Sequence, residues 1–146
     1  VLLASKLDMP IDIPPMGEDR MPDDSWDMAS NIGVNYLKYM TWTDWMYNLS
    51  RYSYGFMLMN ATAAGSFALN CAYHGIPCIG DKKADTQRIL FPDLSIDTYE
   101  IGTASILLDK LRTDKSFYTD VSQKAIEIYN NEFSKEKYLE ILEKDF

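Results

Sequence analysis

A loop of small residues near the middle of the chain has the residue types of an anion-binding turn. It runs over residues 60–66, Asn-Ala-Thr-Ala-Ala-Gly-Ser, between an apolar run and a helix-like segment. Gly65 lets the backbone approach an anion closely, and the amides of Gly65, Ser66 and Phe67 at a helix N-terminus favour a diphosphate. Ser66 also supplies a hydroxyl, for which capping the helix is an equally weighted role.

Three cations follow this loop within residues 82–88: Lys82, Lys83 and Arg88. They stand out in a chain whose net charge is −8. Because they come directly after a predicted buried strand, they are placed to contact a phosphate or carboxylate at the carboxyl end of a sheet. An ordinary solvated loop and short helix is the alternative, with equal weight.

The elements that must position these residues form a βαβ unit. Residues 56–59 are an apolar run of strand length, and residues 67–74 read as a helix. Gly75 suits the left-handed position after a helix, and Pro77 keeps that helix from resuming. Residues 76–79 then predict a second buried strand. Ligands on such units lie where the first strand ends and the helix begins.

The rest of the chain predicts an α/β protein. Residues 1–4 and 34–39 predict strands, residues 94–96 predict an edge strand, and residues 5–30 predict an irregular loop rich in acidic residues and proline. From residue 97 onward the pattern is helical, with Asp114 and Ser134 as N-caps. Strands that alternate with helices indicate a Rossmann-like, three-layer α/β/α fold with a mostly parallel sheet and a helical C-terminus.

Length and composition limit the classes of partner. A chain of 146 residues fits a single domain over residues 1–146, and its acidic pI near 4.5 argues against a nucleic-acid surface. No apolar run has the length of a membrane span. Cys71 and Cys78 are expected to be small buried hydrophobes in a reducing cytoplasm, and a disulfide between them is the alternative. One histidine and two cysteines do not make a zinc site, and the acidic segment lacks calcium-loop spacing.

The run from Gly65 to Pro77, GSFALNCAYHGIP, resembles the donor-binding signature of GT-B glycosyltransferases. That signature is a glycine-rich turn followed by an E-A-x-A-x-G-x-P helix and strand, and here Ala72, Gly75 and Pro77 stand at the matching places. The resemblance covers residues 31–146. It implies the C-terminal, donor-binding lobe of a two-lobe enzyme that transfers a sugar from a nucleoside-diphosphate donor to an unknown acceptor, without metal or cofactor.

The resemblance also implies a set of donor-binding positions. Two glutamates found in many retaining family members correspond to Thr62 and Asn70, and the neutral amide of Asn70 is a weaker acceptor of ribose hydroxyls than a carboxylate. No catalytic residue is identified. The family's separate N-terminal lobe, which holds the acceptor, would precede residue 1, so this lobe alone is expected to be inactive. The expected donor-binding residues are Thr62, Ala64, Gly65, Ser66, Phe67, Asn70, Lys82, Lys83 and Arg88.

Two other functions agree with the same pattern. A non-catalytic Rossmann-like interaction module is favoured by the missing glutamates and opposed by the retained glycine turn and the cations after the strand. A lobe of a sugar-nucleotide epimerase is the other, because such enzymes share the two-lobe fold.

Overall fold

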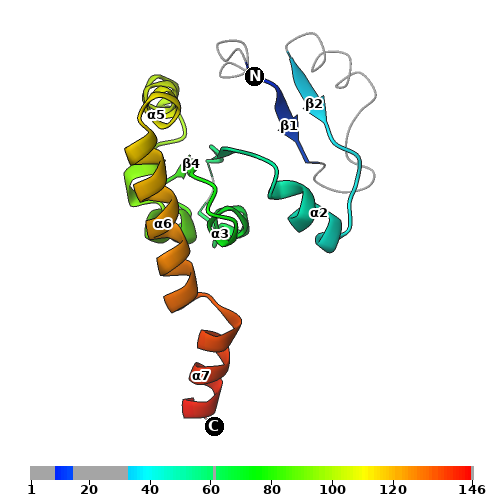
Figure 1. Ribbon diagram of the computed structural model, residues 1–146, viewed down its shortest axis with the longest axis vertical. Coiled ribbons are helices and arrows are strands. Elements are labelled where there is room, and N and C mark those ends of the chain that lie inside the picture. The colour runs from blue at the N-terminus through cyan, green and yellow to red at the C-terminus, as the bar shows by residue number, and fades with distance from the viewer. Residues whose placement is uncertain (1–8, 15–32, 61, 146) are drawn as a thin grey trace. The chain divides into compact units, whose positions relative to one another are not determined.

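The computed structural model describes residues 9–14, 33–60 and 62–145 (Figure 1). The chain divides into two compact units, Val1–Trp45 and Met46–Phe146. The boundary falls within helix α2 (Trp42–Leu49). The strand predicted at residues 1–4 and most of the loop predicted at residues 5–30 lie outside the described residues.

The first unit contains a parallel strand pair, β1 (Ile11–Ile13) with β2 (Val34–Tyr36). The two isoleucines of β1 pack with Tyr36 against Val34, which is buried. The alternation Ile-Asp-Ile accounts for the strand, because it turns both isoleucines to one face. This stretch therefore departs from the irregular loop that the sequence predicts, whereas the strand predicted at residues 34–39 is present in shorter form.

The second unit is built on a small parallel sheet with strand order β3-β4-β5. The strands are β3 (Gly55–Met57), β4 (Cys78–Asp81) and β5 (Ser95–Ile96). Helix α3 (Ser66–Tyr73) connects the first two strands, so the predicted βαβ unit is confirmed with boundaries shifted by one or two residues. All four residues of β4 are buried, which makes this strand the centre of the unit's core.

Helices make up most of the chain after β4 (Figure 1). Asp114 Oδ1 accepts a hydrogen bond from the Phe117 amide at 2.9 Å, and Ser134 Oγ accepts one from the Lys137 amide at 3.2 Å. The predicted helical C-terminus and both predicted N-caps are therefore confirmed. The elements are α4 (Asp85–Leu90), the 3-10 helix η2 (Pro92–Leu94), α5 (Ile101–Thr113), α6 (Lys115–Glu132) and α7 (Lys135–Asp145).

Helix α3 ends in a Schellman cap, which turns the chain into β4. Gly75 has a φ of 67°, its amide donates to Ala72 O at 3.0 Å, and the Ile76 amide donates to Cys71 O at 2.9 Å. These are the two bonds that define the motif. The predicted left-handed glycine is thus confirmed. It turns the chain between the end of α3 and the start of the central strand, β4.

Both cysteines are free thiols in the core, as the sequence predicts, and they are not joined in a disulfide. Cys71 lies on α3 and Cys78 on β4. A hydrogen bond with the Cys71 side chain, together with burial, raises the pKa of Cys78 well above its usual value. Because only the thiolate is a good nucleophile, Cys78 is expected to act as packing rather than as a reactive group.

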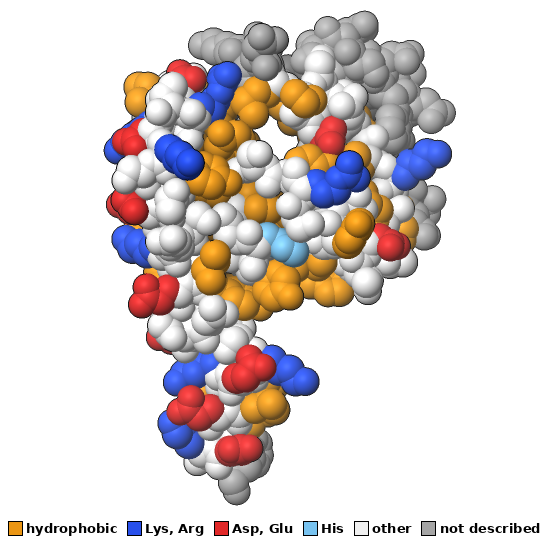
Figure 2. Space-filling view, in the orientation of Figure 1, with side chains coloured by type: hydrophobic (Ala, Val, Ile, Leu, Met, Phe, Trp, Pro, Cys, Tyr) orange, Lys and Arg blue, Asp and Glu red, His pale blue; other side chains and the backbone are white. Residues whose placement is uncertain are grey.

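Helix α7 differs from the helices before it. It contacts α6, but Tyr138 and Ile141 of its predicted apolar stripe are 62% and 46% exposed. On the face drawn in Figure 2, α7 carries both acidic and basic side chains beside apolar surface. Because its apolar residues are little covered, packing stabilises α7 less than it stabilises α5 or α6.

A tyrosine ties α6 to the segment that precedes β3. The Tyr118 hydroxyl donates to Ser53 O at 3.1 Å, and the Tyr118 ring meets the edge of Tyr54 with centroids 5.9 Å apart. Burial, and then Tyr54, raise the pKa of Tyr118 above its usual value. A raised pKa favours the neutral phenol in the folded state. The resulting stability is present below the unfolded-state pKa of about 10 and is lost as pH rises through the folded-state pKa.

Tyr118→Phe is therefore expected to lower the free energy of unfolding at pH 7 by about 1 kcal/mol, because the hydrogen bond is lost. The variant should also lose less of its remaining stability than the wild type does above pH 10. Urea unfolding at pH 7, 9.5 and 11 measures both effects, with Tyr138→Phe as the exposed control. A variant whose stability falls with pH as steeply as that of the wild type would show that Tyr118 does not cause this loss.

Candidate ligand-binding site

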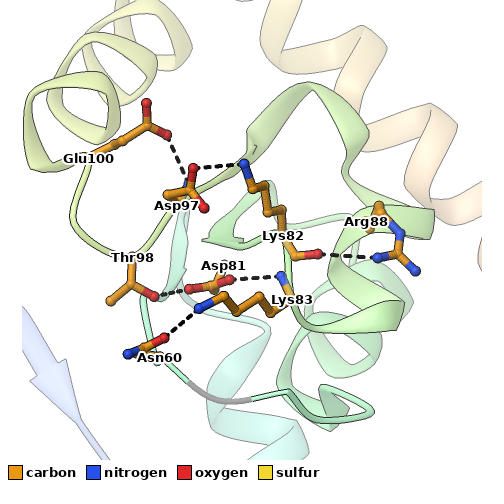
Figure 3. A network of polar contacts seen from close by, with 8 residues as sticks. All are labelled: Asn60, Asp81, Lys82, Lys83, Arg88, Asp97, Thr98 and Glu100. Carbon is orange, nitrogen blue, oxygen red and sulfur yellow. Dashed lines mark hydrogen bonds and ion pairs between the residues drawn. The ribbon is translucent and has the colours of Figure 1, made fainter.

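The loops that follow β3, β4 and β5 meet at the carboxyl edge of the parallel sheet (Figure 3). Lys83 Nζ donates to Asn60 Oδ1 at 2.7 Å, and Asn60 Nδ2 donates to the Tyr99 hydroxyl at 3.1 Å. A parallel bridge between Ala63 and Ala84 also joins the first two loops. This edge is where open parallel sheets bind ligands.

Gly65 is the N-cap of α3, with a φ of 84°, and Ser66 is the first residue of the helix. The prediction that Ser66 is a possible N-cap is therefore wrong, because the left-handed turn at Gly65 brings Ser66 inside the helix. Within the described part of the chain, no side chain caps α3. The first amides of a helix carry partial positive charge, so this N-terminus suits an anionic ligand group.

Thr86 of α4 holds the turn that precedes α3 in place through hydrogen bonds. Its Oγ1 lies 2.6 Å from Ala64 O and 2.5 Å from Gly65 O, and its amide donates to Ala64 O at 3.1 Å. A Cβ on Gly65 would lie 2.5 Å from that same Oγ1. Glycine is thus required by packing as well as by conformation. Ala64 takes part through its carbonyl oxygen, which both the hydroxyl and the amide of Thr86 contact.

A cavity of about 140 Å³ lies beside the N-terminus of α3, at the carboxyl ends of β3 and β4. Its walls are mostly apolar, and Ser66 and Asp81 are the residues with polar side chains among those that line it. Ser66 and Phe67 therefore lie where the sequence predicts a ligand. The lining residues are Met57, Met59, Ala63, Gly65, Ser66, Phe67, Asp81 and Ala84.

Asp81 is the polar group of the cavity that the sequence reasoning missed. It is 1% exposed, Oδ1 accepts the Lys83 amide at 2.7 Å, and Oδ2 accepts the Thr98 hydroxyl (Figure 3). Among the described residues, no lysine or arginine forms an ion pair with it. The available signal was a carboxylate at the end of the apolar run that forms β4.

The three predicted cations have different partners (Figure 3). Lys82 pairs with Asp97 at 2.7 Å, which raises the pKa of Lys82, and Arg88 pairs with Asp85 at 2.9 Å. Lys83 instead donates to the neutral amide of Asn60. Both ion pairs are exposed, so each is weak and easily exchanged. Of these three cations, Lys83 is the one that forms no ion pair with a carboxylate in the described ranges.

Thr62 and Asn70 are not among the residues that line the cavity. Thr62 is exposed in the loop before α3, and Asn70 is half-buried on that helix. Their predicted contacts with a sugar and a ribose stay predictions.

The described ranges contain no group of three or more His, Cys, Asp or Glu side chains arranged to hold a metal ion. Within the same ranges, no helix combines the length and the apolar character needed to cross a membrane. No protein-family model matches this sequence, and no curated protein matches it either.

Proposed function

We propose that the chain is the donor-binding lobe of a GT-B-like glycosyltransferase and binds a nucleoside-diphosphate sugar. One observation carries the proposal. The N-terminus of α3, which no described side chain caps, lies together with Lys83 and a cavity at the carboxyl edge of a parallel sheet. The signature-like run from Gly65 to Pro77 supports the same assignment, and a complete Rossmann-like three-layer lobe is part of the proposal.

The diphosphate is the leaving group of the proposed reaction. The amides at the start of α3 and the ammonium of Lys83 would stabilise its developing negative charge without a metal ion. Lys82 and Arg88 would join only after exchanging their exposed carboxylate partners, Asp97 and Asp85. Transfer would also require a second lobe that holds the acceptor, so this chain alone is expected to bind donor without turnover.

A non-catalytic interaction module is the second candidate, and two observations favour it. The cavity of about 140 Å³ is smaller than the 300–1,000 Å³ common for small-molecule sites. Two of the three cations are also already paired with carboxylates. Such a module would retain the turn at Gly65 for stability alone.

A panel of nucleotides separates the two candidates. Thermal shift and calorimetry would compare UDP, GDP, ADP and CMP with their sugar conjugates. A nucleotide held at a hundredfold excess over its dissociation constant should stabilise the fold by about 2.7 kcal/mol. Selective binding of one base supports the donor lobe, whereas no stabilisation by any member at millimolar concentration supports the interaction module.

Lys83→Gln is expected to weaken binding of the selected nucleotide about tenfold, or about 1.4 kcal/mol, because a charge-assisted hydrogen bond to phosphate is lost. Lys82→Gln, the matched control, should change affinity less than threefold because Asp97 already neutralises Lys82. Calorimetry at low and high salt measures both variants. Equal losses for the two lysines would contradict the distinct role given to Lys83.

A further inference from the structure

The cavity beside α3 combines apolar walls with one buried carboxylate. Met57, Met59 and Phe67 line it together with Asp81, which is 1% exposed. An ionised carboxylate only accepts hydrogen bonds, and its two oxygens offer about four lone-pair sites. Two are used by the Lys83 amide and the Thr98 hydroxyl. Asp81, one of the residues that line the cavity, therefore has lone pairs beyond those that these two bonds use.

This arrangement disfavours a phosphate in direct contact with Asp81. A phosphate beside Asp81 would place two negative charges close together, and no described cation forms an ion pair with Asp81 to offset them. Hydroxyl groups, in contrast, donate to a carboxylate. Apolar walls suit the carbon-bound hydrogens of a ring that carries such hydroxyls.

The size of the cavity limits the group that enters. Its volume of about 140 Å³ is close to that of an engineered cavity of about 150 Å³ that holds benzene. The space therefore accepts one six-membered ring rather than a whole nucleotide. Ring substituents would have to point to the carboxylate or to the mouth.

We propose that this cavity holds the sugar ring of the donor, with Asp81 accepting hydrogen bonds from its hydroxyls. The diphosphate would then lie away from Asp81, against the first amides of α3 and Lys83. The placement of the diphosphate rests on the proposed function, whereas ring recognition by Asp81 can be tested without a nucleotide. This assigns recognition of the sugar to Asp81 of β4, instead of to Thr62 or Asn70.

The test compares Asp81→Asn with Asp93→Asn, the same change at an exposed carboxylate that pairs with Lys124 outside the cavity. Each protein is titrated by calorimetry with UDP, GDP, ADP and CMP and with their sugar conjugates. Each is also titrated with free glucose, galactose, mannose and N-acetylglucosamine, while backbone amide resonances of Ser66 and Lys83 are followed by NMR. Met59→Ala removes an exposed part of the apolar wall and serves if Asp81→Asn does not fold.

Asp81→Asn should weaken the sugar conjugate at least tenfold while leaving the bare nucleotide within twofold, and Asp93→Asn should change neither. Met59→Ala should weaken the conjugate severalfold. Equal losses for conjugate and bare nucleotide, or no loss, would overturn sugar recognition by Asp81 and leave nucleotide binding standing. If no nucleotide binds, the proposed function fails. The titrations with free sugars then test the inference. Amide shifts at Ser66 and Lys83 that Asp81→Asn abolishes support it, and the absence of such shifts overturns it.

Discussion

Gly65→Ala is expected to destabilise the unit Met46–Phe146 by about 3 kcal/mol. The left-handed backbone of Gly65, with a φ of 84°, costs a residue with a Cβ about 1–2 kcal/mol. The new Cβ would also lie 2.5 Å from Thr86 Oγ1 and 3.1 Å from Ala84 Cβ, and such overpacking typically costs 1–3 kcal/mol. Urea unfolding of the variant and the wild type measures the sum.

Two further variants make this result specific. Gly102→Ala lies within α5 with no atom inside 4 Å of its added Cβ, so it should stabilise the protein by up to about 1 kcal/mol. A double-mutant cycle with Thr86→Ala removes the opposing Oγ1 and should recover part of the loss. Stability of Gly65→Ala within about 0.5 kcal/mol of the wild type would contradict the described turn. A loss of nucleotide binding in this variant is informative only after folding has been verified.

Leu108→Ala should destabilise the same unit by about 2–5 kcal/mol, because it leaves a cavity in a buried part of α5. Leu108 is 0% exposed, whereas Ile106 on the same helix is 69% exposed. Ile106→Ala is therefore the matched control and should stay within about 0.5 kcal/mol of the wild type. Similar losses for the two variants, measured by urea unfolding, would show that the described face of α5 is not the one that packs.

Features governed by local rules could be predicted from the sequence. The N-caps at Asp114 and Ser134 each need one side chain and an amide three residues further on, which a sequence displays directly. The Schellman cap at Gly75 is equally local. The strand-helix-strand order around α3 followed from short apolar runs separated by a helical segment.

Features that depend on residues distant in sequence could not be predicted. The ion pair between Lys82 and Asp97 joins residues on two different loops, so the sequence could not show that this cation is occupied. The strand Ile11–Ile13 depends on a partner that begins at Val34. Asp81 was missed for the same reason, because its burial and its Thr98 partner arise only when β4 and β5 lie side by side.

The central claim is that the carboxyl edge of the second unit's sheet binds a nucleotide sugar. Titrating the isotope-labelled chain with the best-bound conjugate, while recording backbone amide shifts, tests it most directly. The largest shifts are expected at Gly65, Ser66, Phe67 and Lys83, with α7 unchanged. Saturable shifts confined to α7 or to the first unit, or none at millimolar conjugate, would contradict the claim.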